Sequence, residues 1–436
     1  MGSAVPRAAV IADSDSRWRW AALTARKIAP GHALDARLLS CATTPAPRQI
    51  EDAGVLPDTS RVVTVAEALA DPAVAEADLL VLGTLGGTAL ALLHSLGAAW
   101  DGGSRRPVVI TGYAGAVYEN LVDGLLLRAG ADLVLANSPH DARRFREAYR
   151  GAGVDEECVV EAGLPFLGGP RYDPSAVARG ERPFTVCFAV QPTVPASPAA
   201  RAGLVEKLRR HALRHPERQV LIKPRTRAGE TGTRPERHAF RDLFEALGDR
   251  PPNLGLAEGS MAEVLNRTDL LVTLSSTAAF EAMQRGIPTA ILTDYGIREA
   301  HGNHFFVSSG ALASFAQLDE GLVPRPGYSW TTEHGIGQRD PFGPARARVA
   351  QLRTRAALPR VRPFYTPQNA PDYLEGLLGR HGLGLSGQPL PDGQAGRAGS
   401  GAMRRLIQRG AGGLYRVGTT RVAPVIRRLA EGAPQG

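Results

Sequence analysis

One segment in the second half of the chain combines hydroxyl side chains with the expected start of a helix. An apolar run at 271–274 predicts a buried strand, and Ser275, Ser276 and Thr277 follow it directly, before a helix expected at 278–285. The first amides of a helix lack partners and lie at the positive end of its dipole. Hydroxyls and free amides there favour a phosphate or another anion. Simple capping of the helix explains the same residues, so both interpretations stay open.

Charged side chains of the second half are expected near this anion site in the folded chain. Lys223 and Arg225 follow an apolar run at 220–222 that predicts another buried strand. Because parallel strands end at one edge of a sheet, we expect both cations to lie near the hydroxyls and to contact a diphosphate. Glu281 lies one helical turn after Thr277 and could hold a pair of ribose hydroxyls. Solvated loop side chains are the alternative interpretation of the two cations.

The spacing of His301 and His304 raises the question of a metal site. They follow the strand predicted at 289–292 and are three residues apart, but the sequence shows no third ligand beside them. We expect His304 to contact the phosphate or the base of a nucleotide, with a loop histidine of no function as the alternative. The three cysteines are far apart and form no CxxC pair. No metal and no other cofactor is therefore predicted.

The first half carries a second group of polar and glycine-rich strand ends. Asp13 and Asp15 follow the strand predicted at 8–12, where a carboxylate could deprotonate an acceptor hydroxyl. Asp15 is the preferred base because it lies further beyond the strand end, and capping of the first helix by Asp13 and Ser14 is the alternative. The Asp-Ser-Asp triplet also matches a manganese-binding motif, a weak match at three residues. The other candidates on this acceptor side are Thr84, Gly86, Gly87, Gly112 and Tyr113.

Short apolar runs alternate with helical patterns along both halves, which predicts parallel sheets built from βαβ units. The predicted strands are 8–12, 61–65, 79–82, 108–111, 133–136, 184–190, 220–222, 271–274 and 289–292. The predicted helices are 18–26, 89–96, 120–127, 139–149, 198–215, 235–247, 261–266 and 278–285. Two such doubly wound halves bind ligands outside the carboxyl ends of their strands, and we expect them to face a common cleft.

Gly- and Pro-rich stretches mark the expected boundaries between domains. One such stretch at 163–170 separates the two halves, and another follows residue 383. We predict an acceptor domain, a donor domain, C-terminal helices that pack back on the body, a flexible linker and a basic amphipathic tail. Their expected ranges are 1–170, 171–350, 351–383, 384–402 and 403–436.

The basic character of the chain is concentrated near its end. The net charge is +8, but residues 401–430 contain seven arginines and neither Asp nor Glu, so the rest carries 8 − 7 = +1. A near-neutral body argues against nucleic-acid binding. No apolar run reaches the ~20 residues that span a bilayer, and no signal segment is evident. We predict a cytoplasmic protein whose tail is either solvated or held at the anionic inner face of the membrane through residues 403–430.

The segment 270–292, LLVTLSSTAAFEAMQRGIPTAIL, resembles the donor-binding segment of bacterial GT-B glycosyltransferases. Capsule-polysaccharide transferases and CDP-glycerol glycerophosphotransferases share this layout, and Lys223-Pro-Arg225 resembles their K-P-H/R strand end. More broadly, residues 5–380 resemble an actinobacterial family that is assigned as glycosyltransferases and classed as a domain of unknown function. The resemblance implies the GT-B fold, with two Rossmann-like doubly wound domains. It also implies a nucleotide-activated donor of the CDP, CMP or UDP type.

These observations predict a metal-independent glycosyltransferase. It would move a sugar, or a related unit, from a nucleotide-activated donor to a cell-envelope glycan or lipid-linked acceptor. A UDP-sugar 2-epimerase-like isomerase is an alternative with the same fold, although its sequence pattern is not found. A non-catalytic scaffold or binding protein is a second alternative. No GxGxxG motif follows a predicted strand and opens a predicted helix, which disfavours an NAD-dependent dehydrogenase.

Overall fold

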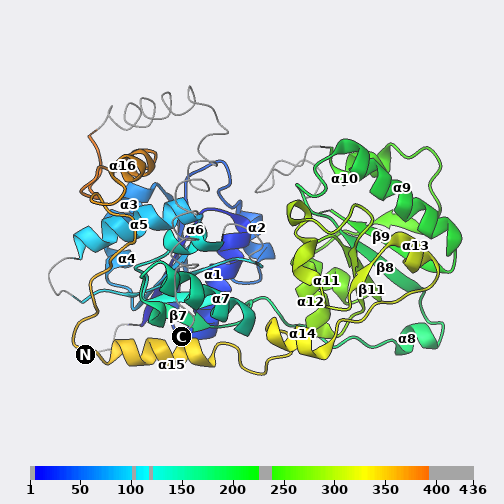
Figure 1. Cartoon of the computed structure of the whole chain (residues 1–436), viewed down its shortest axis with the longest axis horizontal. Coiled ribbons are helices and arrows are strands. Elements are labelled where there is room, and N and C mark those ends of the chain that lie inside the picture. The colour runs from blue at the N-terminus through cyan, green and yellow to red at the C-terminus, as the bar shows by residue number, and fades with distance from the viewer. Residues whose placement is uncertain (1–4, 101–104, 117–120, 225–237, 392–436) are drawn as a thin grey trace, which may run out of the picture. The chain divides into compact units, whose positions relative to one another are not determined.

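The computed structural model describes residues 5–100, 105–116, 121–224 and 238–391. The chain divides into two compact units (Figure 1). The first unit consists of Met1–Pro165 together with Asp340–Gly436, and the second unit is Phe166–Arg339. The predicted linker lies partly, and the predicted basic tail wholly, outside the described residues. Within the described ranges, none of the helices combines the length and the apolar character needed to cross a bilayer.

The first unit is built on a seven-stranded sheet in which all neighbouring strands are parallel. Successive strand residues point to opposite faces. Ala9 and Ile11 therefore join one buried apolar cluster, and Ala8 and Val10 join another. The order across the sheet is β3 (Thr59–Val63), β2 (Ala33–Leu39), β1 (Arg7–Ala12), β4 (Leu79–Gly83), β5 (Val108–Gly112), β6 (Leu133–Ala136) and β7 (Val159–Glu161).

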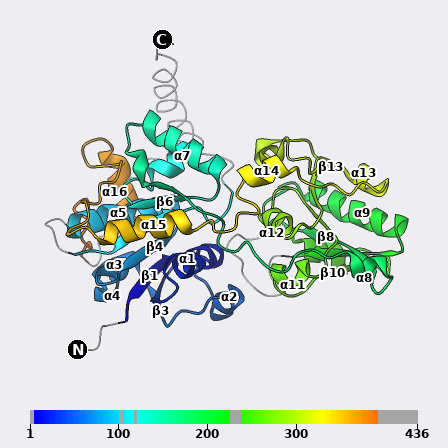
Figure 2. The ribbon, with the colours of Figure 1, turned by 90° about the horizontal axis from the view of Figure 1, so that it is seen from below.

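Helices from both ends of the chain cover this sheet. The late helix α15 packs beside α1, and α16 packs beside α5 (Figures 1 and 2). The C-terminal segment therefore completes the core of the first unit. Its helices are α1 (Asp15–Ile28), α2 (Pro47–Asp52), α3 (Val65–Ala70), α4 (Pro72–Ala75), α5 (Gly86–Ala99), α6 (Leu121–Leu126), α7 (Pro139–Gly151), η1 (Glu156–Cys158), α15 (Gly343–Arg353) and α16 (Pro371–Gly379).

The second unit is built on a six-stranded sheet that is also parallel throughout. Its strands lie in the order β10 (Leu254–Leu256), β9 (Arg218–Lys223), β8 (Phe184–Ala189), β11 (Leu270–Thr273), β12 (Thr289–Leu292) and β13 (Leu312–Ala313). Its helices are α8 (Ser175–Ala178), α9 (Pro198–Arg214), α10 (Phe240–Glu245), α11 (Met261–Leu265), α12 (Ala278–Arg285), η2 (Glu299–His301), η3 (Asn303–Phe306), α13 (Phe315–Asp319) and α14 (Tyr328–Glu333).

The two parallel sheets confirm the predicted α/β class, and local signals place several helix ends correctly. Ser197 caps α9 by accepting from the amide of Ala200 at 3.4 Å, with Pro198 at the first helical position. Gly286, with φ of 80°, ends α12 in the left-handed conformation that glycine favours. The strand predicted at 61–65 is β3, shifted toward the N-terminus. Of the helix predicted at 235–247, residues 235–237 lie outside the described ranges, and the described part contains the shorter helix α10 at Phe240–Glu245.

The strand β2, which lies next to the edge strand β3, is missing from the predicted strands because charged residues interrupt its apolar pattern. Asp35 and Arg37 are both buried. Asp35 accepts two hydrogen bonds from Arg7, at 2.7 and 2.8 Å, and Arg37 donates to Asp71 at 2.6 Å. A charged group can be buried in a sheet when an opposite charge and hydrogen bonds satisfy it. Such pairing between distant residues leaves no local trace in the sequence.

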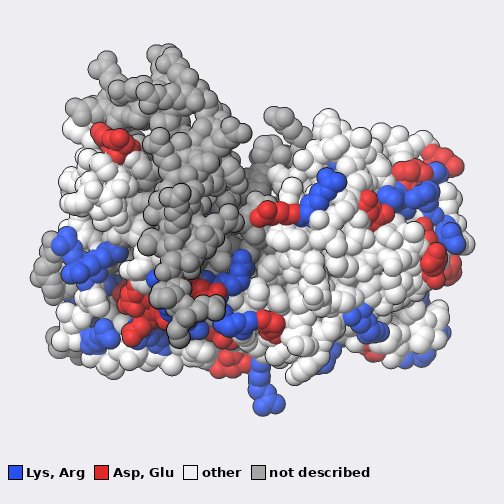
Figure 3. Space-filling model, in the orientation of Figure 1, with Lys and Arg blue, Asp and Glu red and all other residues white. Residues whose placement is uncertain are grey.

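Charges of both signs are interspersed on the described surface that Figure 3 shows. Ion pairs of the first unit include Arg353 with Asp78 at 2.7 Å and Arg346 with Asp340 at 2.5 Å. A mixed surface of this kind is typical of a solvated globular protein. On this face the described residues do not form the basic stripe by which nucleic-acid-binding proteins contact phosphates.

Candidate functional site

Ser275, at the carboxyl end of β11, is held entirely by protein groups. It is 3% exposed. Its amide donates to Oε1 of Gln191 at 2.8 Å, and its hydroxyl accepts from Nε2 of Gln191 at 3.0 Å. The same hydroxyl donates to the carbonyl of His301 at 2.5 Å. Ser275 therefore joins the ends of β8 and β11 to the loop that carries His301, and its hydroxyl has little capacity left for a ligand.

Ser276 and Thr277 differ from Ser275 because they are half-buried and their hydroxyls make fewer hydrogen bonds. The hydroxyl of Ser276 accepts from the amide of Ala278 at 3.3 Å. Within the described part of the chain, neither the amide nor the hydroxyl of Thr277 makes a hydrogen bond. Both groups lie at the N-terminus of α12, where the helix dipole attracts negative charge. This terminus thus offers two donors to an anion.

Lys223 is the last residue of β9, and its strand is separated from β11 by β8 alone. The lateral spacing of strands puts the ends of β9 and β11 about 10 Å apart. Nζ of Lys223 donates to the carbonyl of Pro224 at 2.7 Å. The structure therefore brings Lys223, Ser276 and Thr277 to one edge of the sheet, as the sequence predicted. Arg225 lies outside the described residues.

Glu281 and His304 complete the predicted donor set. Glu281 is 4% exposed. Burial lowers the pKa of Arg285, and the negative charge of Glu281 opposes this shift. His304 is half-buried in η3, next to Asn303. Asn303 is fully buried, and its Nδ2 donates to the carbonyl of Leu292, the last residue of β12, at 3.0 Å. The loop that bears His304 is therefore fixed at the carboxyl edge of the sheet, where α12 also begins.

In the first unit, Asp13 joins the ends of two neighbouring strands. One carboxylate oxygen forms an ion pair with Arg17, and the other accepts from the amide of Leu85 at 2.9 Å. Ser14 occupies the N-cap position of α1, but its side chain makes no capping hydrogen bond. The alternative in which Asp13 and Ser14 cap this helix is therefore wrong. Asp15 is the first residue of α1 and is half-buried.

Arg128, which the sequence did not single out, connects most of the predicted acceptor side. It donates to the carbonyls of Gly112 at 2.9 Å and Thr84 at 3.4 Å. Its guanidinium also lies 4.1 Å from the ring centroid of Tyr113, and burial raises the pKa of that phenol. The hydroxyl of Thr84 is buried and has no hydrogen-bond partner among the described residues. Arg128 thus holds the ends of β4 and β5 together beside an unsatisfied hydroxyl.

The two glycines that begin α5 allow close packing at this edge. A Cβ atom on Gly86 would lie 2.8 Å from a methyl group of Leu127. A Cβ atom on Gly87 would lie 3.3 Å from Leu377 of α16. Gly112 is equally confined, because a Cβ atom there would lie 2.7 Å from the Trp20 ring. A side chain at any of the three positions would therefore clash with or crowd its neighbours.

Two further titratable groups lie near this edge and were not predicted. His381 follows α16, and burial lowers its pKa; the charge of Arg380 adds to this effect, whereas that of Asp13 opposes it. His381 therefore lies within electrostatic reach of Asp13 and is a neutral base at neutral pH. Burial raises the pKa of the Asp141 carboxyl in α7, the helix that follows β6. Neither side chain belongs to a recognisable motif, so neither could be identified from local sequence.

Comparison with known proteins gives a family and a fold. Residues 8–352 match the family model described as "Putative glycosyltransferase (DUF6716)". No curated protein matches the chain. A structure of S. aureus MnaA with UDP has a TM-score of 0.53 at 11% identity, covering 82% of this chain and 100% of that one.

Two other solved structures are also similar to the chain. The UDP-N-acetylglucosamine 2-epimerase from Rickettsia bellii has a TM-score of 0.50 at 12% identity, covering 80% of this chain and 96% of that one. A UDP-glucosyltransferase from Polygonum tinctorium has a TM-score of 0.45 at 12% identity, covering 92% and 99%. At this level of identity a structural likeness shows the fold alone, and the predicted GT-B class is confirmed.

Proposed function

The chain belongs to the family described as "Putative glycosyltransferase (DUF6716)", and on this premise we propose that it is a nucleotide-sugar-dependent, metal-independent glycosyltransferase. It moves a sugar or a related unit to a cell-envelope glycan or lipid-linked acceptor. The observation that carries the proposal is the N-terminus of α12. There the amide and hydroxyl of Thr277 make no hydrogen bond among the described residues, next to the half-buried Ser276.

On the donor side, the edge of the second unit's sheet holds the diphosphate of the nucleotide. Thr277 and Ser276 donate to one phosphate, and Lys223 supplies a positive charge from the end of β9. As the bond to the sugar breaks, negative charge grows on the leaving nucleotide. Donors that are already oriented stabilise this charge without reorganisation. Arg225, Glu281 and His304 remain the proposed additional donor contacts, with the nucleotide of the CDP, CMP or UDP type.

On the acceptor side, Asp15 is the proposed general base, and Asp13 ties the start of α1 to the segment that follows β4. Both carboxylate oxygens of Asp13 already have partners, Arg17 and the amide of Leu85. Asp15 is half-buried at the start of α1, whereas Asp13 is buried. A carboxylate in this position removes the proton of an acceptor hydroxyl as the new glycosidic bond forms. Thr84, Gly86, Gly87, Gly112 and Tyr113 line the proposed acceptor side.

The acceptor and the cellular location belong to the same proposal. A cytoplasmic enzyme that acts on a lipid-linked or envelope acceptor works beside the inner face of the membrane. The seven arginines of residues 401–430 suit an anionic lipid surface. These residues lie outside the described ranges, so the proposal for them rests on composition.

An epimerase is the second candidate, because a structurally similar protein is named a UDP-N-acetylglucosamine 2-epimerase. The two activities differ in their need for an acceptor. We would incubate the full chain with UDP-N-acetylglucosamine and with other nucleotide sugars, and follow the sugar signals by proton NMR. We expect each nucleotide sugar to persist until an envelope lipid or glycan fraction is added, after which one of them releases its nucleotide. Conversion to a C2 epimer without an acceptor would instead establish the isomerase.

A further inference from the structure

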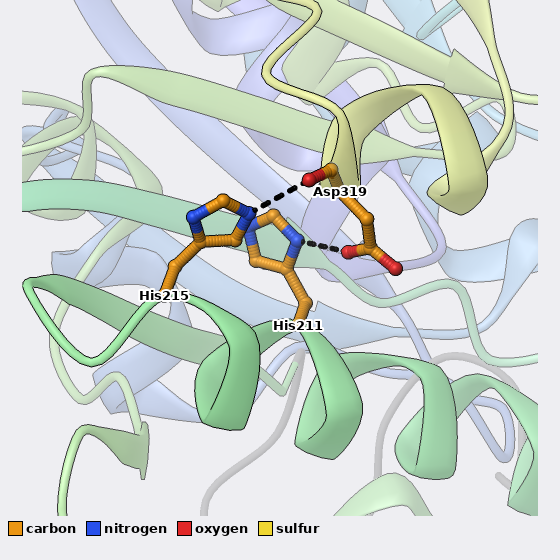
Figure 4. A group of neighbouring side chains, drawn as sticks. All are labelled: His211, His215 and Asp319. Carbon is orange, nitrogen blue, oxygen red and sulfur yellow. Dashed lines mark hydrogen bonds and ion pairs between the residues drawn. The ribbon is translucent and has the colours of Figure 1, made fainter.

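We propose that His211, His215 and Asp319 of the second unit form a binding site for a divalent transition-metal cation, with Zn²⁺ as the best fit (Figure 4). His211 and His215 are four residues apart on α9 and its C-terminal end, so they share one face of the helix. Asp319 is the last residue of α13, which packs against α9. One potential ligand atom from each residue lies within 4.8 Å of the other two.

The three side chains converge, as Figure 4 shows. Nδ1 of His211 lies 2.6 Å from Oδ1 of Asp319, and Nε2 of His215 lies 3.2 Å from the carbonyl oxygen of Asp319. The two imidazole rings are 4.7 Å apart. Two imidazole nitrogens and one carboxylate oxygen are ligands that Zn²⁺ accepts at about 2.0–2.2 Å, with a water molecule in the fourth position. Small side-chain rotations would bring the atoms to these distances.

Metal binding would rearrange the hydrogen bonds of His211 in a defined way. A metal at Nδ1 replaces the hydrogen bond to Asp319, and the ring proton moves to Nε2. Nη1 of Arg218 is 3.5 Å from this Nε2 and would turn away, toward Glu217, whose Oε1 is already 3.4 Å from its Nε.

The surroundings supply an outer carboxylate and an entry path. Oε1 of Glu217 lies 3.3 Å from Nδ1 of His215, so it can accept the Nδ1 proton and leave Nε2 of that ring facing the cluster. A carboxylate behind a ligating histidine is the common arrangement in metal sites. His211 is fully buried, but the side chains of His215 and Asp319 are 15% and 14% exposed. A cation can therefore reach the cluster from solvent.

The position of the cluster indicates a structural metal. α9 starts after the carboxyl end of β8 and ends just before β9 begins at Arg218. Its last turn therefore lies at the amino edge of the sheet, whereas Lys223 and Thr277 follow the carboxyl ends of strands. The length of the strands separates the two edges by about 15–20 Å. The metal would tie α9 to α13 and stabilise the second unit, and it would take no part in sugar transfer.

Zinc titration of the full, untagged and chelator-treated chain tests this site. We expect saturable binding of one Zn²⁺ by calorimetry, a higher melting temperature, and tetrahedral cobalt absorption when Co²⁺ replaces zinc. The variant His215→Gln removes one ligand near the surface, where folding tolerates the change. We expect it to weaken zinc binding on the order of 100-fold.

His32→Gln is the matched control, because His32 is 14% exposed and also lies beside a carboxylate, Asp78 at 3.7 Å. It should bind zinc as the wild type does. Two results would each overturn the proposal. One is the lack of saturable binding by the wild type, which would leave the cluster as a hydrogen-bonded contact between helices. The other is equal affinity in the His215→Gln and His32→Gln variants.

Discussion

Replacing Asp15 by asparagine is expected to slow sugar transfer by about two to four orders of magnitude, the usual contribution of a general base. The amide keeps the size and the hydrogen-bonding shape of the carboxylate but cannot accept the acceptor proton. Asp15 is half-buried at the first position of α1, so the fold should survive with a small change in melting temperature. The measurement is kcat for nucleotide release with the donor sugar that binds, in the presence of acceptor.

The variant Asp13→Asn distinguishes a residue that stabilises the fold from one that acts as the general base. Asp13 is paired with Arg17 and with the amide of Leu85, so this change should lower the melting temperature as well as the rate. Asp52→Asn, at an exposed position on α2, is the control and should change neither. If Asp15→Asn retains full kcat, Asp15 is not the base. His381→Gln would then be the next variant, since a neutral imidazole near Asp13 can accept the same proton.

The second large effect concerns stability. Replacing Asp269 by alanine should lower the free energy of unfolding of the second unit by about 3 kcal/mol, the lower end of the usual cost of breaking a buried ion pair. Asp269 is fully buried just before β11 and accepts two hydrogen bonds from Arg182, at 2.5 and 2.8 Å. It also accepts from the amide of Thr185 at 2.8 Å. Alanine would leave that amide and the guanidinium without their partner.

Hydrogen exchange is suited to this measurement because a chain with two units need not unfold in one step. Protection of the amides in β8 and β11 reports the second unit alone. Glu181→Ala is the matched control, since Glu181 also forms a two-bond pair with an arginine, Arg179, but at the exposed surface. We expect exchange to accelerate in Asp269→Ala and to stay unchanged in Glu181→Ala. Equal exchange rates in both variants would show that the buried pair of Asp269 and Arg182 stabilises the second unit no more than the exposed pair does.

The fold was predictable from the sequence mainly where a strand and the following helix are both apolar and uninterrupted. The segment from β11 through α12 to β12 is the best case, because its hydroxyls, its helix and its terminal Gly286 are all local signals. The strands β2 and β10 were not predictable in the same way. β2 contains Asp35 and Arg37, and β10 has three residues, too few to show a period.

The candidate site was predictable to the level of strand ends and no further. The sequence placed Lys223, Ser276 and Thr277 at one sheet edge, and the structure agrees. It could not show that the Ser275 hydroxyl is used by Gln191 and His301, because these partners are 84 and 26 residues away. Arg128 and His381 were missed for the same reason.

The histidines illustrate how spacing alone can mislead. The pair His301 and His304 drew attention as a metal candidate that lacked a third ligand. His211 and His215 have helical spacing too, but their partner Asp319 is more than one hundred residues away in the sequence. The packing of α13 on α9 is what completes this cluster. A third ligand of this kind can be found only in the folded chain.

The most direct test of the central claim is nucleotide binding at the N-terminus of α12. We would measure melting temperatures with UDP, CDP, CMP, GDP and their sugar conjugates, for the wild type and for the double variant Lys223→Ala, Ser276→Ala. Ser197→Ala, which removes the capping hydroxyl of α9, is the control for a lost cap. A ligand at one hundred times its dissociation constant stabilises the folded state by about 2.7 kcal/mol, which is readily detected.

We predict that one nucleotide raises the melting temperature of the wild type and of Ser197→Ala, and leaves the double variant unchanged. That result would establish the donor site and identify the base of the nucleotide. If no nucleotide stabilises the wild type, or if the double variant is stabilised equally, the edge formed by Lys223, Ser276 and Thr277 is not a donor site. The chain would then be better explained as a non-catalytic member of its family.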